Sequence, residues 1–200
     1  MRTLARHGVA ETTTRMLANE AQVNQATLRY YFGSKDDLLL AVLQELMRQT
    51  HEVVMSVVNP EMLSGSANLR TIIADAMKAF WAYVEREPEL QMIQLELTLY
   101  TQRHPESAWL AREQYAGYVS VVETILRETL IVLRMDNGVS FEQIARFLVA
   151  GFDGLTLQYL SDRDAARAQR DLNTFIATIV GLLETPVSSV SHHVSERSHT

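Results

Sequence analysis

Cysteine is absent from the 200 residues, which excludes a disulfide framework, thiolate metal sites and every mechanism that needs a cysteine nucleophile. Proline and glycine are scarce, with four and eight residues, so few positions interrupt regular secondary structure. Long apolar runs are also missing: a run such as 38–43 is far too short to cross a bilayer, and no secretory leader is visible. These absences favour a cytoplasmic protein without a membrane partner.

The charge is unevenly distributed along the chain. The formal net charge is −6, which argues against a nucleic-acid partner when the chain is taken as a whole. Residues 1–48, however, hold six basic and five acidic side chains, whereas the remainder holds twelve basic and nineteen acidic ones. A small DNA-reading head on an acidic body is therefore permitted, although charge alone does not identify one.

The hydrophobic pattern predicts an all-α fold. Apolar residues recur at spacings of three and four almost throughout, and no sustained alternation indicates a strand. A short helix is expected before Gly8. Further helices are expected over 13–20, 25–32, 35–58, 67–86, 89–102, 106–134, 140–160 and 165–184.

Several helix ends carry recognisable signals. Ser34 suits the N-cap of the helix that starts at residue 35, and Ser140 with Gln143 forms a capping box. The pair 137–138 (Asn-Gly) supplies a left-handed stop. The tail 186–200 is rich in serine and histidine and poor in apolar anchors, so we expect it to be disordered.

Two short helices joined by a tight turn lie within residues 12–43. Ala18 allows the two helices to cross closely, and Asn24 suits the N-cap of the second helix. Five apolar side chains are spaced to meet in one small core: Met16, Leu17, Val23, Leu28 and Phe32. This is the helix-turn-helix arrangement, whose second helix lies in the major groove of DNA.

The side chains left outside that core are suited to DNA. Glutamine can pair with adenine, arginine with guanine, and alanine or threonine methyl groups can contact thymine. Hydroxyl and ammonium groups suit phosphate oxygens. Six candidates on the second helix are Gln25, Ala26, Thr27, Arg29, Tyr30 and Tyr31, and those expected at phosphates are Thr13, Thr14, Tyr31 and Lys35. Taken singly, each has a simpler explanation as a cap, a core residue or a solvated charge.

The stretch 12–39 resembles, in order and without gaps, the DNA-binding domain of TetR-family transcriptional regulators. The resemblance implies an all-helical homodimer whose N-terminal helices bind operator DNA and whose C-terminal domain binds a small-molecule inducer. It also implies that Thr14 and Arg15 touch the DNA backbone, that Tyr31 and Lys35 contact phosphates, and that the second helix reads bases. A shorter stretch, 152–155, resembles the corresponding helix of BetI-type regulators.

Three features depart from the family pattern. The chain opens at what resembles the last turns of the first helix, 1–7, so that helix is expected to be truncated and to leave Met16 and Leu28 with less packing. Gln22 replaces the usual turn glycine, and a positive φ at such a residue costs about 1 kcal/mol. Arg29 stands where tyrosine is common and adds a charge to the reading helix.

The last two helices are apolar on more than one face, which favours a four-helix dimer interface. Small residues in the first of them, such as Ala150 and Gly154, would let a neighbour approach closely. The interface candidates are Phe141, Leu148, Gly151, Leu155, Tyr159, Leu172, Phe175, Ile176, Ile179 and Leu183. The alternative is that these residues form the buried core of a monomer.

Aromatic residues and methionine concentrate in the middle helices, and such residues commonly line small-molecule cavities. The candidates for a ligand pocket are Trp81, Met92, Tyr100, Trp109, Tyr115, Tyr118 and Phe152. Many residues of this kind also serve as ordinary core. The identity of the ligand does not follow from the sequence.

The sequence predicts a DNA-binding head over 1–45, a ligand-binding and dimerisation domain over 46–185 and the tail 186–200. The predicted function is a ligand-responsive transcriptional regulator, a repressor that a small-molecule inducer releases from a palindromic operator. The alternative is a ligand-binding or scaffold dimer with a vestigial head that ignores DNA. An enzyme is not expected, since the histidines are scattered and Asp162 and Asp164 suit a turn. No cofactor or metal is expected.

Overall fold

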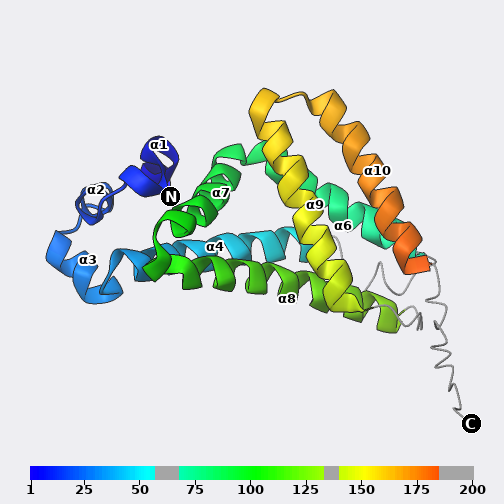
Figure 1. Cartoon of the computed structure of the whole chain (residues 1–200), viewed down its shortest axis with the longest axis horizontal. Helices are drawn as coiled ribbons and strands as arrows, with labels where there is room; N and C mark the ends of the chain where they lie inside the picture. The colour runs from blue at the N-terminus through cyan, green and yellow to red at the C-terminus, as the bar shows by residue number, and fades with distance from the viewer. Residues whose placement is uncertain (57–67, 133–139, 185–200) are drawn as a thin grey trace, which may run out of the picture.

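The computed structural model describes residues 1–56, 68–132 and 140–184, and these residues form helices without any strand (Figure 1). The predicted all-α fold is confirmed. The expected stop at 137–138 and the expected disordered tail 186–200 lie outside the described residues. The helices are α1 (Arg2–Glu11), α2 (Thr14–Glu20), α3 (Gln25–Phe32), α4 (Lys35–Met55), α6 (Leu69–Arg86), α7 (Pro88–Arg103), the 3₁₀ turn η1 (Pro105–Ser107), α8 (Ala108–Val132), α9 (Phe141–Asp162) and α10 (Ala165–Glu184).

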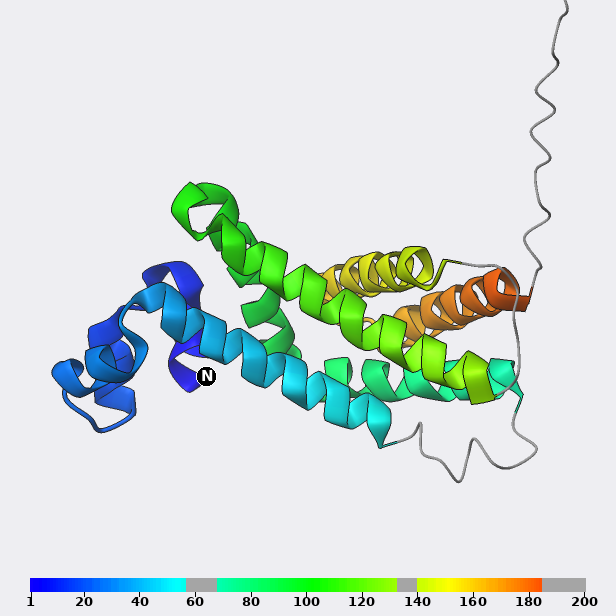
Figure 2. The same ribbon diagram turned by 90° about the horizontal axis from the view of Figure 1, so that it is seen from below.

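The helices form a small head and a larger body. Helices α1, α2 and α3 lie together at one end of the molecule, and α4 and α8 run away from that end along its long axis (Figures 1 and 2). Helices α9 and α10 pack against each other on the side of the body that is far from the head. In the part of the chain that the structure describes, no helix is long and apolar enough to cross a membrane.

Local capping sets the helix starts that the sequence predicts. The Ser34 hydroxyl accepts a hydrogen bond from the Asp37 amide at 3.1 Å, and the Asp37 carboxylate accepts one from the Ser34 amide at 3.0 Å. Both halves of a capping box are therefore present at the start of α4. The Ser140 hydroxyl accepts from the Gln143 amide at 3.3 Å at the start of α9.

The first helix continues further than expected, through Gly8 to Glu11. Gly8 interrupts it with φ 75° and ψ 166°, a conformation that favours glycine. A Cβ at this position would lie 2.9 Å from the Glu96 carboxylate oxygen of α7. The kink therefore brings the end of α1 against α7, and both Leu4 and Val9 are buried there.

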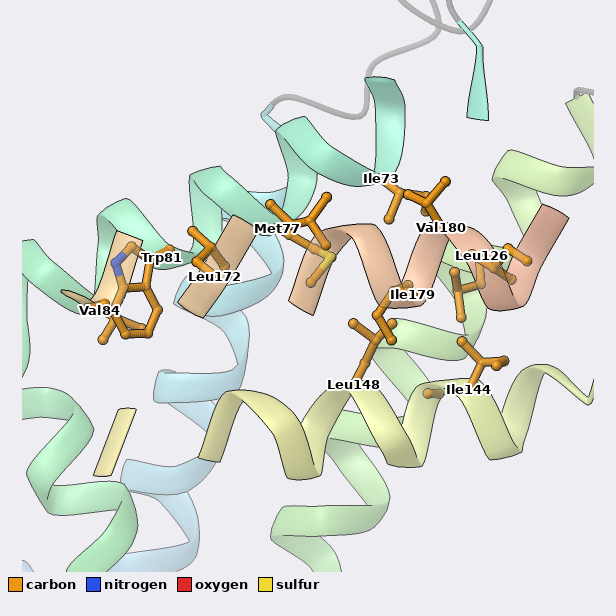
Figure 3. Packing of buried hydrophobic residues seen from close by; sticks show 14 of the residues in the cluster. Ile73, Met77, Trp81, Val84, Leu126, Ile144, Leu148, Leu172, Ile179 and Val180 are labelled. Atoms are coloured by element: carbon orange, nitrogen blue, oxygen red, sulfur yellow. The ribbon is translucent and has the colours of Figure 1, made fainter. Parts of the chain in front are cut away.

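The largest core cluster lies among α6, α8, α9 and α10 (Figure 3). Figure 3 shows Leu172 and Ile179 of α10 pointing toward α6 and α9 of the same chain. Six residues expected at a dimer interface are buried in this way: Leu148, Tyr159, Leu172, Ile176, Ile179 and Leu183. Their apolar stripe serves the core of the protomer, because α10 packs on both α6 and α9.

A second core cluster joins the head to the body. Leu4 and Val9 of α1 pack with Leu39, Leu43 and further residues of α4, α7 and α8. The head is therefore not a separate globule on a loose linker.

Candidate DNA interface and ligand cavity

The helix-turn-helix core forms around Leu17, Ala18, Leu28 and Leu38, with Phe32 packed against it. Two residues expected in this core contribute less: Met16 is half-buried, and Val23 is 39% exposed because it sits in the turn between α2 and α3. Leu28 is buried.

Backbone geometry in the turn matches the expectation from the sequence. Gln22 has φ 55°, which confirms the positive φ predicted at the position of the usual glycine. The Asn24 carboxamide caps α3 by accepting hydrogen bonds from the Thr27 amide at 2.6 Å and from the Thr27 hydroxyl at 2.9 Å. Because the Thr27 hydroxyl is engaged in the cap, its methyl group is the part of the side chain left for an apolar contact.

The start of α2 is also held by side chains. Thr13 caps this helix by accepting from the Met16 amide at 3.3 Å. The Thr14 hydroxyl accepts from the Gln25 carboxamide at 3.1 Å, which ties α2 to the first residue of α3. The first contact is local to α2, and the second links α2 to α3.

One face of α3 remains uncovered. Gln25, Ala26, Arg29 and Tyr30 lie on the same side of the helix because the last three follow Gln25 by one, four and five positions. All four side chains are exposed. Tyr30 and Tyr31 are 85% and 74% exposed, and their rings meet edge to face with centroids 5.4 Å apart. A role in the protomer core is therefore excluded for this tyrosine pair. Arg15 of α2 is exposed as well.

Neither arginine of this surface is neutralised by the protein. Among the described residues, no carboxylate lies within ion-pairing distance of Arg15 or Arg29. Both guanidinium groups remain available to an external acceptor, and the surface carries the donors that base edges and phosphates require.

Lys35 lies in a different environment from the phosphate contact expected of it. Its ammonium donates to the Val9 carbonyl at 2.9 Å and the Ala10 carbonyl at 3.3 Å, and lies 4.9 Å from the centre of the Tyr100 ring. Burial lowers the pKa of Lys35. The last carbonyls of a helix attract a cation, so Lys35 holds α1 to α4 and α7.

Two further contacts fasten the head to the body. The Glu96 carboxylate of α7 accepts from the Val9 amide at 2.8 Å, and the Ser107 hydroxyl of η1 donates to the Asp36 carboxylate at 2.6 Å. Helix α7 is consequently attached to the head directly, through side chains on one of its faces.

The body contains a cavity of about 130 Å³ between α4, α6, α7, α8 and α9. Of the seven residues expected at a ligand pocket, Tyr115, Tyr118 and Phe152 line it. The cavity is otherwise bounded by Met47, Thr50, Val54, Ile73, Ala76, Met77, Phe80, Gln91, Gln94, Leu95, Thr98, Gln114, Val121, Val122, Ile125, Leu126, Leu148, Val149, Asp153 and Thr156.

The other four expected pocket residues lie elsewhere. Trp81 is buried in the largest core cluster with its ring centroid 5.5 Å from that of Tyr159. Met92 is 39% exposed, Tyr100 stacks on His104 at 4.0 Å, and Trp109 packs on the cluster that joins head and body. Their helices turn these side chains away from the cavity.

Polar side chains also line the cavity, although the sequence pointed only to aromatic residues and methionine. The Tyr118 hydroxyl donates to the Gln94 carboxamide, whose nitrogen donates to the Gln91 oxygen at 3.2 Å. The Gln91 nitrogen and the Thr50 hydroxyl are buried without a partner in the part of the chain described. Two polar groups of the wall thus remain free for a bound molecule.

Asp153 of α9 is the one carboxylate among the described residues that line this cavity. Its Oδ2 accepts from the Tyr115 hydroxyl at 2.9 Å, and burial raises the pKa of Asp153. Burial also raises the pKa of the Tyr115 and Tyr118 phenols, which keeps both hydroxyls protonated as donors. The only sequence signal for Asp153 was its place in the short BetI-like stretch 152–155.

The outer face of α9 and α10 carries exposed apolar side chains. Phe147, Leu157 and Leu182 are 47%, 56% and 42% exposed, and none of them was among the expected interface residues. The remaining expected ones, namely Phe141, Gly151, Leu155 and Phe175, are half-buried. The Phe175 ring covers Gly151, where a Cβ would lie 2.2 Å from it.

A helix-turn-helix head fastened to a helical body with an internal cavity defines a DNA-binding regulator that responds to a ligand. The chain belongs to the TetR family. The model for bacterial regulatory proteins of the tetR family matches residues 1–42, and that for the tetracyclin repressor-like C-terminal domain matches residues 69–182, more than half of the chain.

Individual relatives agree with this assignment. The nicotine-responsive transcriptional repressor HdnoR of Paenarthrobacter nicotinovorans is 29% identical over 162 residues, which cover 81% of this chain and 80% of that protein. BetI regulators of Brucella species are 39% identical over only 49 residues, 24% of this chain and 25% of theirs, so the link to them is minor.

Solved structures share the fold. A TetR-family regulator from Rhodococcus sp. has a TM-score of 0.73 at 15% identity and covers 90% of this chain and 92% of its own. FadR from Bacillus subtilis, solved with stearoyl-CoA, has a TM-score of 0.66 at 20% identity. The match covers 94% of this chain and 95% of FadR. Members of the family bind operator DNA, dimerise and bind small molecules. The protein is accordingly a ligand-responsive, DNA-binding transcriptional repressor.

Proposed function

We propose that the exposed face of α3 reads operator bases. Gln25 and Arg29 would bond base edges, Ala26 and the Thr27 methyl group would contact thymine, and Tyr30 would lie in the same groove. Thr13, Thr14, Arg15 and Tyr31 flank this face and would contact the phosphates. Lys35 is assigned a different task, since its ammonium already holds α1 to α7.

We infer that two copies pair through the outer face of α9 and α10. The exposed apolar side chains Phe147 and Leu157 support this, together with Gly154, where a Cβ would meet nothing within 4 Å. The half-buried Phe141, Gly151, Leu155 and Phe175 belong to the same interface. Two heads joined in this way would meet successive major grooves of a palindromic operator.

One observation supports release by a ligand: α7 contacts the cavity and the head at once. Gln91, Gln94 and Thr98 line the cavity, while Glu96 and Tyr100 contact α1 and Lys35. A ligand that shifts α7 would displace the head relative to the body. Because two heads fit DNA at only one separation, such a ligand would favour the state that does not bind the operator.

The test of this function uses operator DNA that the protein itself selects from genomic fragments. The operator Kd is measured by fluorescence anisotropy with and without each small molecule that calorimetry shows to bind the cavity. Cavity ligands are expected to raise the operator Kd at least tenfold. Cavity ligands that leave it unchanged contradict ligand-controlled release.

The domain boundaries follow from the same proposal. The head would cover residues 1–45 and the ligand-binding and dimerisation domain 46–185, so that α4 passes from one into the other. We take the protein to act on cytoplasmic DNA as a regulator rather than as an enzyme, in keeping with its family. The exposed face of α3, with its solvated tyrosine pair and with Arg29, which has no ion-pair partner among the described residues, argues against a vestigial head.

A further inference from the structure

The cavity has a polar end and an apolar end. Helices α8 and α9 run antiparallel along it, since Tyr115 meets Asp153 while Leu126 clusters with Ile144. Along α8 the lining changes from Gln114, Tyr115 and Tyr118 to Val121, Val122, Ile125 and Leu126. Ten residues of helix span about 15 Å, so the two ends are well separated.

The polar end carries a carboxyl group, Asp153, that has no basic partner among the described residues lining the cavity. Asp153 is bonded only by the Tyr115 hydroxyl, at Oδ2, and no described residue donates to Oδ1. Lysine, arginine and histidine are absent from the described residues that line the cavity. The remaining polar groups near it, Gln94, Gln114 and Tyr118, bond mainly to one another.

Aromatic rings stand next to this carboxylate. Phe152 precedes Asp153 on α9, and its ring meets that of Phe80 edge to face with centroids 4.7 Å apart. Tyr115 and Tyr118 lie across the cavity on α8 with ring centroids 6.3 Å apart. Aromatic faces attract organic cations, most strongly where water is excluded.

We propose that the inducer is a compact organic cation, whose protonated amine pairs with Asp153 and whose apolar body points toward Ile125. This identifies the ligand class of the proposed function and rests on it. The cavity of about 130 Å³ is close to the roughly 150 Å³ that accommodates benzene in an engineered apolar site, which suits a body of one ring.

Burial and charge both favour this ligand class. Burial of Asp153 disfavours its ionised form, as the raised pKa indicates, and a ligand cation supplies the counter-charge that the protein lacks. An anionic ligand would meet the carboxylate with no basic group to compensate. A neutral ligand would leave the charge unpaired or require a protonated Asp153.

The test compares cations with neutral molecules of the same shape. N-methylbenzylamine is protonated at pH 7.5, and benzyl methyl ether replaces its nitrogen with a neutral oxygen. Nicotine and its uncharged lactam cotinine form a second pair, and phenylacetate serves as an anion. Binding to the full-length dimer is measured by calorimetry without DNA.

The amine of each pair is expected to bind at least tenfold more tightly than its neutral partner, and phenylacetate more weakly than either. Asp153→Asn should abolish the preference for the amine. Asp171→Asn, which removes one carboxylate from the neighbouring α10 outside the cavity, should retain it. Circular dichroism checks that both variants are folded.

A wild-type protein that shows no preference for the amines overturns the proposal, and so does an unchanged preference in Asp153→Asn. Failure of the proposed function would look different. Amines would then bind through Asp153 in calorimetry, yet leave the affinity for operator DNA unaltered.

Discussion

The Glu96 carboxylate of α7 accepts a hydrogen bond from the Val9 amide of α1 at 2.8 Å. Val9 is buried, so water cannot replace this acceptor if the carboxylate is removed. The bond therefore joins the DNA-binding head to the helix that also lines the ligand cavity.

Removal of this acceptor should destabilise the protein in a way that depends on the replacement. Glu96→Ala leaves a buried N–H group unpaired, which costs about 1–3 kcal/mol. Glu96→Gln keeps an acceptor oxygen at the same position, so its free energy of unfolding should fall by less than half as much as that of Glu96→Ala. Urea denaturation measures both values, and equal losses in the two variants would contradict this role of the hydrogen bond.

The salt dependence of operator binding should separate Arg15 from Lys35. Arg15→Ala removes a proposed phosphate contact and should reduce the slope of log affinity against log salt by about one per protomer. Lys35→Met should weaken binding by loosening α1, yet leave the slope unchanged. If the slope falls by about one per protomer in Lys35→Met, Lys35 contacts a phosphate after all, as the sequence predicts.

The proposed dimer interface predicts different behaviour for two exposed leucines. Leu157 on α9 and Leu99 on α7 are 56% and 64% exposed, and only Leu157 lies on the outer face of α9 and α10. Leu157→Glu should yield a folded monomer in sedimentation velocity and weaken operator binding by roughly 100-fold or more, because the second head is no longer linked. Leu99→Glu should remain a dimer.

The control variant decides how this result is understood. Dissociation caused by Leu99→Glu, or an intact dimer of Leu157→Glu, would place the interface on another surface of the molecule.

Asp153 should make the stability of the ligand-free protein depend on pH. Because burial raises its pKa, the folded state keeps a proton that the unfolded chain loses above about pH 4. This contribution to stability is present at low pH and is lost as the pH rises through the raised pKa. Asp153→Asn should therefore be more stable than the wild type at pH 8, by about 1 kcal/mol, with the difference shrinking toward pH 4.

Urea denaturation at a series of pH values gives this difference directly. Asp171→Asn serves as the control outside the cavity. A gap between Asp153→Asn and the wild type that stays constant from pH 4 to pH 8 would show that the ionisation of Asp153 does not cause it.

The helix starts could be predicted because their signals are local. Ser34 caps α4 through a residue three positions along the chain, and Asn24 caps α3 in the same manner. The exposed face of α3 was predictable too. Once Leu28 is assigned to the core, helix geometry determines which four positions remain exposed.

Contacts between distant segments could not be predicted in this way. The sequence predicts Lys35 as a free cation at the start of a helix. In the structure its ammonium donates to the Val9 carbonyl and lies over the Tyr100 ring. Trp81 and Tyr115 are equally typical of a pocket wall, and only the rotation of α6 and α8 decides which of them faces the cavity.

The proposed dimer face shows the same limitation. The strongest apolar stripe of α10, which includes Leu172 and Ile179, packs into the protomer core. On α9, the less apolar face with Phe147 and Leu157 is left exposed. Amphipathic periodicity finds the face that is most apolar, and in a helix with two apolar faces that face belongs to the core.

Selection from a random duplex library, followed by sequencing, tests most directly whether α3 reads operator DNA in a paired head. The wild type should enrich a pseudo-palindrome whose half-sites lie one helical turn or a multiple apart. Arg29→Ala should change the preferred base at one position of each half-site. No enrichment by the wild type, or enrichment of asymmetric single sites, would contradict the account.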